Sequence, residues 1–303
     1  MTVQWTNADI PDQSDRVAVV TGANSGLGYH LTLALAGAGA EVVLACRNSV
    51  KAESAMASIR ASVPGARLSF IRLDLADLSS VAAFVAGFTG THGRLDLLIN
   101  NAGLMAVSES RTVDGFETQL GVNHLGHFAL TTQLLPVITS TPGARVASMS
   151  SLAHRGGRLA LDDLMFERRG YGRWAAYCQS KLANLLFIAE LQRRLVEAGS
   201  GAVAVAAHPG MAQSNLGSEY ALTNWIMRLS APFGRGSTAA RTLPLLRAAT
   251  DPSVLGGQFY GPKWGVFGPP VLETPSQQAR DGATARALWD VSAGLTDQAR
   301  RLA

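Results

Sequence analysis

The feature that most constrains the fold of this chain is an alternation of short apolar runs with helix-period segments, which begins near residue 16. The runs place Val, Ile and Leu at consecutive positions, as expected of strands that are buried on both faces. Strands that alternate with helices predict a parallel sheet covered by helices on both sides. We therefore expect a single α/β domain with a doubly wound (Rossmann), mostly parallel sheet of seven strands.

The expected elements are separated by Gly and Pro residues. Strands are expected at Arg16–Val20, Glu41–Cys46, Leu68–Leu73, Leu95–Ile99, Arg145–Met149, Val203–Ala207 and Gln258–Tyr260. Helices are expected at Leu27–Ala38, Lys51–Val63, Leu78–Thr89, Val113–Ile138 and Ala175–Ala198. Residues 1–14 precede the pattern, and we expect them to form a disordered or loosely packed arm ahead of the domain at 15–303.

Two stretches interrupt the alternation, at residues 152–174 and 211–236. Both leave strands at the carboxyl edge of the sheet, where such folds bind ligands. We expect both to be substrate-pocket insertions, and the apolar cluster at 225–229 favours a mostly hydrophobic substrate. An alternative is that Asn224–Phe233 docks on a membrane surface, because pocket lids and interfacial helices share the same amphipathic pattern.

The composition narrows the class of protein. Of 303 residues, 47% are hydrophobic and 16% charged, which indicates a packed globular chain. The net charge of +4 comes from scattered residues, so no nucleic-acid surface is expected. Only Cys46 and Cys178 occur, which favours a reducing cytoplasmic location without disulfides or a metal cluster. No apolar stretch approaches the roughly 20 residues of a membrane helix, and no secretory signal pattern is present.

A glycine-rich turn connects the first strand to the first helix, with the sequence Thr21-Gly-Ala-Asn-Ser-Gly-Leu-Gly28. Glycines allow a sharp turn there and let a pyrophosphate approach the N–H groups at the start of the helix. A tight strand–helix turn needs glycine even in proteins that bind nothing, but the flanking strand and helix favour a dinucleotide site. The expected cofactor contacts are Gly22, Asn24, Ser25, Gly26, Leu27 and Gly28.

The second strand ends in Cys46-Arg47-Asn48, where an NAD-binding protein would carry a carboxylate. The guanidinium of Arg47 can pair with a 2′-phosphate, which favours NADP(H). The alternative is a solvated Arg at a strand end. Asp74 and Leu75 follow the third strand, where Asp74 is placed either to meet the adenine ring or to cap a turn. Small residues after the fourth strand, Asn101, Ala102 and Gly103, allow close approach of a flat cofactor.

Tyr177 and Lys181 open the helix after the fifth strand, four residues apart and therefore on one helix face. A tyrosine has a pKa of about 10, too high for efficient acid–base chemistry near neutral pH. A nearby ammonium favours the phenolate and lowers that pKa. In isolation such a pair is common on solvated helices, but its place in a dinucleotide-binding sheet makes it a candidate catalytic pair.

Taken together, these motifs resemble the short-chain dehydrogenase/reductase family. The similarity covers about residues 14–290 and is closest to the branch of retinol dehydrogenases and related NADPH-dependent carbonyl reductases. The motifs that carry it are the glycine turn, Asn100-Asn-Ala-Gly103, Ser150-Ser151, Tyr177-Cys-Gln-Ser-Lys181, Ala45-Cys-Arg-Asn48, Asn123-His-Leu-Gly-His-Phe128 and His208-Pro-Gly210. The interval of 26 residues between Ser151 and Tyr177 is longer than the family usually has and matches this branch.

The resemblance implies a catalytic tetrad. Tyr177 would be the general acid in reduction and the base in oxidation, and Ser151 would orient the substrate oxygen. Lys181 would lower the pKa of Tyr177 and hold the nicotinamide ribose, and Asn123 would support a water-mediated proton relay behind it. Ser150 is the adjacent alternative to Ser151.

The segment after the sixth strand resembles the family segment that holds the nicotinamide carboxamide. It contributes Pro209, Gly210, Ala212 and Ser214, with Ser where the family usually has Thr. The histidines near these motifs are expected to make structural hydrogen bonds, while His154 and Trp174 could also line the pocket.

The leading hypothesis is an NADP(H)-dependent carbonyl reductase or alcohol dehydrogenase acting on a hydrophobic ketone, aldehyde or alcohol. An alternative is a catalytically inactive NADP(H)-sensing protein of the same fold. The intact set of Ser, Tyr, Lys and Asn argues against a sensor, which needs no proton donor. The resemblance also implies a homodimer or homotetramer that pairs through the helices expected at Val113–Ile138 and Ala175–Ala198, although some relatives remain monomeric.

Overall fold

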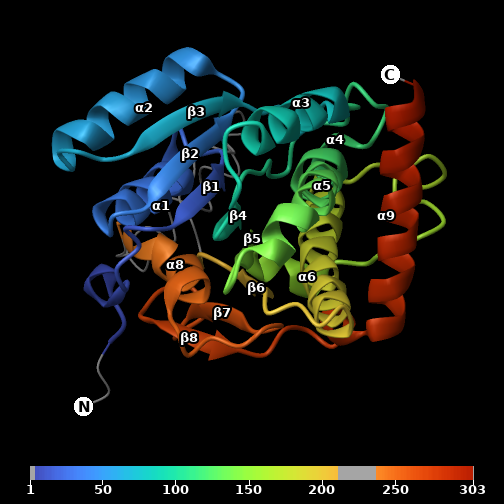
Figure 1. Ribbon diagram of the computed structural model, residues 1–303. Coiled ribbons are helices and arrows are strands. Elements are labelled where there is room, and N and C mark those ends of the chain that lie inside the picture. The colour runs from blue at the N-terminus through green and yellow to red at the C-terminus, as the bar shows by residue number, and fades with distance from the viewer. Residues whose placement is uncertain (1–3, 211–236, 303) are drawn as a thin grey trace.

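The computed structural model describes residues 4–210 and 237–302, which form an α/β domain around one sheet (Figure 1). The sheet has eight strands in the order β3-β2-β1-β4-β5-β6-β7-β8. All neighbours pair in parallel except β7 and β8, which pair antiparallel. The strands are β1 (Val17–Thr21), β2 (Glu41–Cys46), β3 (Leu68–Arg72), β4 (Leu97–Asn100), β5 (Arg145–Met149), β6 (Val203–Ala207), β7 (Phe259–Pro262) and β8 (Pro270–Glu273).

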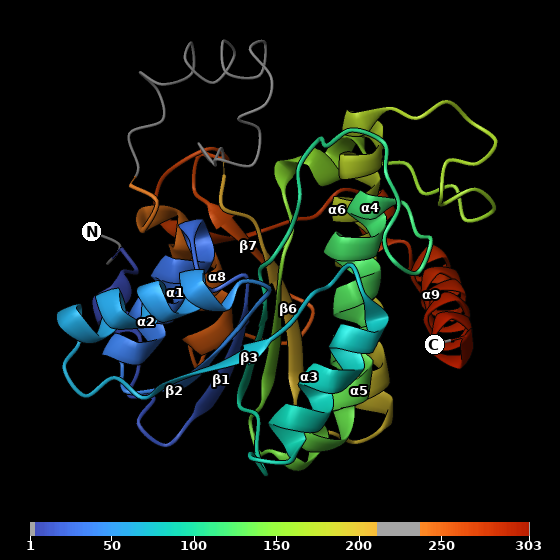
Figure 2. The ribbon, with the colours of Figure 1, turned by 90° about the horizontal axis from the view of Figure 1, so that it is seen from above.

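Helices cover both faces of the sheet (Figures 1 and 2). On one face lie α1 (Gly26–Gly37), α2 (Ser49–Ser62) and α8 (Leu243–Thr250). The other face carries α3 (Leu78–Thr89), α5 (Gly126–Ser140) and α6 (Arg173–Glu197), with α9 (Gly282–Leu302) packed outside them. Shorter turns are η1 (Asn7–Asp9), α4 (Thr118–Leu120), the π-helical η2 (Gly121–Leu125), η3 (Leu152–Gly156), η5 (Ala240–Thr242) and η6 (Gln278–Arg280).

The strands are apolar throughout because their alternate side chains enter two separate cores. In β1, Val17 and Val19 join the core beneath α3, α5 and α6, whereas Ala18 and Val20 join the core beneath α1, α2 and α8. All five residues of β1 are buried. This arrangement confirms the doubly wound sheet that the uninterrupted apolar runs predict.

The expectation of seven strands misses β8, which adds an antiparallel edge to the sheet. Another expected boundary was also wrong: the helix expected from Val113 begins at Thr118. Its start is delayed because Glu117 caps α4, accepting the N–H groups of Gln119 at 2.8 Å and Leu120 at 2.7 Å.

The N-terminal segment is packed where the structure describes it, contrary to the expected loose arm. Trp5 is buried in the core beneath α1 and α8, and Gln13 is buried as well. The N–H of Gln13 donates to the carbonyl of Ala38 at 2.8 Å, which ties the segment to the end of α1. A buried indole and a main-chain bond hold this segment against the domain.

The strand order reverses between β1 and β4, which are neighbours in the sheet but separated in sequence by β2 and β3. The connections from these two strands leave in opposite directions, so a crevice opens at their carboxyl ends. The turn at Gly22 follows β1, and the loop at Asn101–Gly103 follows β4. The fold therefore brings two of the sequence-predicted cofactor segments to one place.

Candidate active site

The glycine turn after β1 has a backbone conformation that lets other groups approach its main chain closely. Gly22 has a φ of +66° and Gly26 one of +54°, a region that glycine enters without strain. A Cβ at Gly28 would lie 2.1 Å from the carbonyl oxygen of Gly22, so the first turn of α1 packs directly on the end of β1. The side chain of Ser25 makes no capping bond to α1 among the described residues. The N–H groups at this helix start are therefore available to an anion.

The loop after β4 is fastened to the same turn. The hydroxyl of Thr21 accepts the N–H groups of Asn101 and Ala102, both at 2.9 Å, and the Asn101 amide donates to the Thr21 carbonyl at 2.9 Å. The other amide atom, Oδ1 of Asn101, is buried and has no hydrogen-bond partner in the described part of the chain. A buried acceptor beside a glycine cradle fits a bound dinucleotide, whose donors would satisfy it.

The residues expected around the adenosine end lie at the ends of β2 and β3. Arg47 is exposed, and the side chain of Asn48 caps α2 by accepting the N–H of Lys51 at 2.9 Å. The carboxylate of Asp74 accepts the N–H of Ala76 at 3.0 Å, which is the turn-capping role considered for it. Leu75 is buried in the core.

Tyr177 lies in α6 with its side chain buried. Burial raises the pKa of its phenol, while a hydrogen bond with Ser151 lowers it, and burial has the larger effect. Lys181 is not among the groups that shift this pKa, so the lowering expected from its ammonium is not seen. The protein holds Tyr177 as a neutral phenol in contact with Ser151, which suits a proton donor.

Lys181 is buried one helical turn further along α6. Its ammonium lies 5.8 Å from the centre of the Tyr177 ring and donates to the carbonyl of Met149 at 3.2 Å. Burial lowers the pKa of Lys181 to about 8. The lysine therefore keeps its charge near neutral pH at a considerable cost in folding free energy.

The two neighbouring serines after β5 have different partners. The hydroxyl of Ser150 donates to the main-chain carbonyl of Lys181 at 2.8 Å, which fastens α6 to the end of β5. The hydroxyl of Ser151 accepts the N–H of Ala153 at 3.2 Å and contacts Tyr177. This geometry favours Ser151 as the serine that shares the site with Tyr177.

Asn123 lies in the π-helical turn η2, an irregularity that is frequent at functional sites. Its Oδ1 accepts the N–H of Leu104 at 2.7 Å, and its amide nitrogen donates to the Leu104 carbonyl and to the Ser180 hydroxyl, both at 2.9 Å. A Cβ at Gly103 would lie 3.0 Å from Oδ1 of Asn123 and 3.4 Å from Nζ of Lys181. The absence of a side chain at Gly103 thus lets the β4 loop, η2 and α6 converge.

His127 is a site-supporting residue for which the sequence indicates no specific partner. The carbonyl of Asn123 can only accept, so Nδ1 of His127, 3.1 Å away, carries a hydrogen. Nε2 then accepts from the hydroxyl of Thr21 at 2.9 Å. His127 thereby connects η2 to the glycine turn, and its spacing of four from Asn123 is the signal that could have indicated the contact.

Buried histidines predict a loss of stability in acid. Burial lowers the pKa of His124 to about 3 and that of His127 to about 4, from 6.5. As the pH falls below 6.5, these histidines become protonated in the unfolded chain but stay neutral in the folded protein. Each histidine therefore lowers the free energy of unfolding by about 1.4 kcal/mol per pH unit between pH 6.5 and its folded pKa.

Urea unfolding at about pH 7.5 and about pH 5.5 measures this loss. His124→Gln removes one of the titrating rings, so we expect the loss between the two pH values to be smaller by about 1.4 kcal/mol than in the wild type. An identical loss in both proteins would contradict the neutral state of buried His124.

The insertion at 152–174 lies against the site and is tied down by polar contacts. The hydroxyl of Tyr171 accepts from the amide of Gln119 at 2.9 Å and donates to the carbonyl of Val107 at 3.1 Å. Trp174 is 47% exposed, and its ring centre lies 6.0 Å from that of Tyr177. His154 is fully buried, so the expectation that it could line the pocket is wrong.

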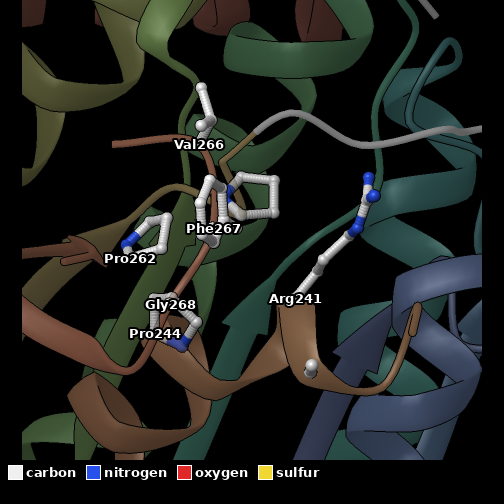
Figure 3. Close-up of a pocket in the computed structure, with 8 residues that line it drawn as sticks. Arg241, Pro244, Pro262, Val266, Phe267 and Gly268 are labelled. Carbon is white, nitrogen blue, oxygen red and sulfur yellow. The ribbon is translucent and has the colours of Figure 1, made fainter. Parts of the chain in front are cut away.

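Pro209, which follows β6 and precedes Gly210, borders a pocket that Figure 3 shows in close-up. Pro262, Val266 and Phe267 crowd around it from β7 and the loop after β7, and Arg241 extends beside it from η5. A Cβ at Gly210 would lie 2.3 Å from the carbonyl oxygen of Val266. The loop after β7 therefore packs directly against the expected carboxamide-binding segment.

Some of the sequence-based expectations fall outside the described residues. Ala212, Ser214, the insertion at 211–236 and the membrane-docking candidate Asn224–Phe233 belong to this group. Within residues 4–210 and 237–302, no helix is both long and apolar enough to cross a membrane. The same ranges contain no group of three or more His, Cys, Asp or Glu side chains that could hold a metal ion.

A doubly wound sheet with a glycine cradle at its switch point, beside a neutral tyrosine and a buried lysine, defines a nicotinamide-dependent oxidoreductase. Residues 16–224 match the short chain dehydrogenase family. The chain belongs to this family, in its retinol dehydrogenase-like branch, and is an oxidoreductase that acts on CH–OH groups.

Relatives support this placement over most of the chain. Human retinol dehydrogenase 12 is 40% identical over 291 residues, covering 96% of this chain and 88% of the relative. Human retinol dehydrogenase 13 is 39% identical over 303 residues, covering 96% and 86%. A crystal structure of an uncharacterized protein from Mycobacterium paratuberculosis is 43% identical with a TM-score of 0.82, covering 97% of this chain and 98% of that one.

Proposed function

We propose that this protein is an NADP(H)-dependent carbonyl reductase and alcohol dehydrogenase for mostly hydrophobic ketones, aldehydes or alcohols. The observation that carries the proposal is the buried, neutral Tyr177 in contact with Ser151 and one helical turn from Lys181. When bound, the nicotinamide ring supplies or accepts the hydride. The chain's own groups then have to hold the substrate oxygen and move one proton.

We assign these roles by the position of each group. Tyr177 donates its phenolic proton to the substrate oxygen in reduction and takes it back in oxidation, while Ser151 hydrogen-bonds the same oxygen. The ammonium of Lys181 holds the ribose hydroxyls and stabilises the phenolate that forms. Asn123 fixes the β4 loop at Leu104 and supports the relay that returns a proton to the site.

Binding of the dinucleotide is assigned to the turn after β1, the ends of β2 and β4, and the segment after β6. The first turn of α1 meets the pyrophosphate, and Arg47 meets a 2′-phosphate. Asn101, Ala102 and Gly103 lie against the cofactor, and Pro209 begins the segment for the carboxamide. An exposed Arg at the end of β2, where a carboxylate would repel phosphate, supports NADP(H) over NAD(H). A structural neighbour at 23% identity, RhlG from Pseudomonas aeruginosa, was solved as an NADP complex.

Exchanging Arg47 for Asp tests the choice of cofactor. The substitution removes the cation and places a negative charge where it repels the 2′-phosphate. The ratio of kcat/KM for NADPH to kcat/KM for NADH should therefore fall by about 100-fold. Arg286→Asp, on the exposed side of α9, makes the same charge change far from the dinucleotide and should leave the ratio within about twofold. Equal ratios in the Arg47 variant and the wild type would contradict the proposed contact between Arg47 and the 2′-phosphate.

Apolar and aromatic surface near Tyr177 supports a hydrophobic substrate. Trp174 offers a half-exposed indole beside the phenol, and relatives are named retinol dehydrogenases. The direct test follows the consumption of NADPH and NADH with matched panels of bulky apolar and small polar carbonyls. We expect turnover with NADPH and the bulky set; turnover confined to small polar carbonyls would refute the substrate class.

The alternative of a sensing protein that binds NADP(H) without catalysis predicts cofactor binding with no turnover of any carbonyl. The contact between Tyr177 and Ser151 favours the enzyme, because a sensor needs no proton donor beside the cofactor.

A cytoplasmic location and pairing of two or more copies stay predictions. Trp289 of α9 packs on Phe128 and Phe187, with ring centres 4.9 Å and 5.8 Å away. This helix covers part of the surface on α5 and α6 through which pairing is expected, so a dimer would have to use what α9 leaves exposed.

A further inference from the structure

Two buried histidines, His154 and His208, both contact the ring of Phe259 in β7. His154 follows Ser151 by three residues in η3, and His208 directly precedes the segment that begins at Pro209. Both are fully buried. Their ring centres lie 5.4 Å and 5.3 Å from that of Phe259, so one aromatic group connects the ends of β5 and β6.

Main-chain groups fix the tautomer of His154. The N–H of Ser276 donates to Nε2 at 3.2 Å, so the hydrogen of the neutral ring is on Nδ1. Nδ1 lies 2.6 Å from the carbonyl oxygen of Ser151 and donates to it. The same carbonyl also accepts the main-chain N–H of His154 at 3.1 Å. The turn that presents the Ser151 hydroxyl is thus held from the interior of the protein.

His208 has the opposite tautomer. The N–H of Gly210 donates to Nδ1 at 3.1 Å, so the hydrogen of the ring is on Nε2. Nε2 lies 3.2 Å from Oε1 of Glu273, a close polar contact without hydrogen-bond geometry. A Cβ at Gly261 would lie 2.1 Å from Nε2 and 2.3 Å from Oε1, so only glycine admits this approach across β7. His208 thereby links the turn at Gly210 to β8.

Both anchors come from one short segment of the chain. Glu273 ends β8, and Ser276 follows three residues later. A parallel dinucleotide fold does not need an antiparallel edge strand. Here β8 has a specific structural role, because its segment carries one partner for each histidine.

We propose that His154 and His208 are positioning residues that hold the Ser151 turn and the Gly210 turn at a fixed separation by anchoring both to the β8 segment. The proposal rests on the functions proposed above for Ser151 and for the segment after β6.

The charges around the pair keep both rings neutral. Burial is the largest cause that lowers the pKa of each, and the Arg155 guanidinium lowers both further. His208 also lowers the pKa of His154, whereas Ser151 raises it; Glu273 raises that of His208. A proton added to either ring would set an imidazolium N–H against the main-chain N–H of Ser276 or Gly210. The neutral state is therefore the one that preserves both anchors.

Steady-state kinetics of the full-length protein with NADPH and an apolar carbonyl test the two histidines separately. His154→Ala should lower kcat about tenfold and leave the KM for NADPH within about twofold, because it loosens only the Ser151 turn. His154→Asn should recover most of kcat, since its amide can donate to the same carbonyl. Glu273→Ala should raise the KM for NADPH about tenfold, and Glu273→Gln, which keeps a polar oxygen in contact with His208, should not.

Equal kinetics of the Ala and Asn variants at His154 would overturn the role of His154. Equal KM values for NADPH in the Ala and Gln variants at Glu273 would overturn the positioning role of His208. This comparison remains valid even if His154→Ala fails to fold. Ser151→Ala, measured in parallel, separates the two proposals. If Ser151→Ala keeps its turnover, the proposed function is refuted. If Ser151→Ala loses turnover while the kcat of His154→Ala equals that of the wild type, only the positioning role is refuted.

Discussion

Replacing Tyr177 with Phe should lower kcat by about 10³-fold while leaving the Kd for NADPH within about threefold. The substitution removes only the phenolic oxygen, which contacts Ser151 and carries the proton that we assign to the substrate oxygen. The ring itself stays packed beside Trp174, so the walls of the site persist. Stopped-flow fluorescence of bound NADPH measures the Kd, and steady-state assays measure kcat.

Tyr260→Phe is the matched control for this change. Its hydroxyl donates to Gln258 at 2.9 Å, at the start of β7 and away from the carboxyl edge of the sheet. We expect its kcat to stay within about twofold of the wild type. A Tyr177→Phe protein as active as this control would show that the phenol carries no proton in the reaction.

Lys181→Met should lower activity strongly and at the same time stabilise the protein. The unfolded chain keeps Lys181 charged up to its ordinary pKa of 10.5, but burial lowers the folded pKa to about 8. Below pH 8 the folded protein therefore holds a charge at a cost, and this cost disappears as the pH rises from 8 to 10.5. At pH 7 it is about 3 kcal/mol, the free-energy equivalent of a shift between these two values.

Methionine has a similar length and no charge, so it removes this cost without leaving a cavity. The carbonyl of Met149, which loses the ammonium, keeps its second donor in Asn184 at 3.2 Å. We expect kcat to fall by about 10³-fold and the free energy of unfolding at pH 7, measured in urea without cofactor, to rise by about 2–3 kcal/mol. A variant that is less stable than the wild type at pH 7 would contradict the buried charge. Lys181 thus lowers stability at a position where its charge serves function.

Much of the fold could be predicted because the strands obey one simple rule. Strands with two buried faces have uninterrupted apolar runs, and the expected bounds Glu41–Cys46, Arg145–Met149 and Val203–Ala207 match β2, β5 and β6. β8 escaped prediction since its four residues, Pro270–Glu273, begin with Pro and lie at a sheet edge, where period and composition carry little signal. The π-helical turn at Gly121–Leu125 was likewise hidden, because one extra residue in a helical turn barely changes the apolar period.

The candidate site likewise has a part that the sequence could predict and a part that it could not. The glycine turn and the pair Tyr177 and Lys181 could be found because their chemistry depends on residue type at short spacing. The partners of His154 could not, since its contact with Ser276 joins residues 122 positions apart. The raised pKa of Tyr177 could not be predicted either. It results from the burial of the phenol, which depends on tertiary packing and cannot be read from the neighbouring residues in the sequence.

The central claim is that this chain transfers a hydride between NADPH and an apolar carbonyl while Tyr177 moves the proton. Mass spectrometry of the alcohol formed from apolar carbonyls and NADPH deuterated at the transferable position tests it most directly. We predict one deuterium per molecule of alcohol with the wild-type protein, and about 10³-fold less labelled alcohol formed by Tyr177→Phe in the same time. Bound NADPH without labelled alcohol from any carbonyl of the panel would contradict the claim and favour a sensing protein.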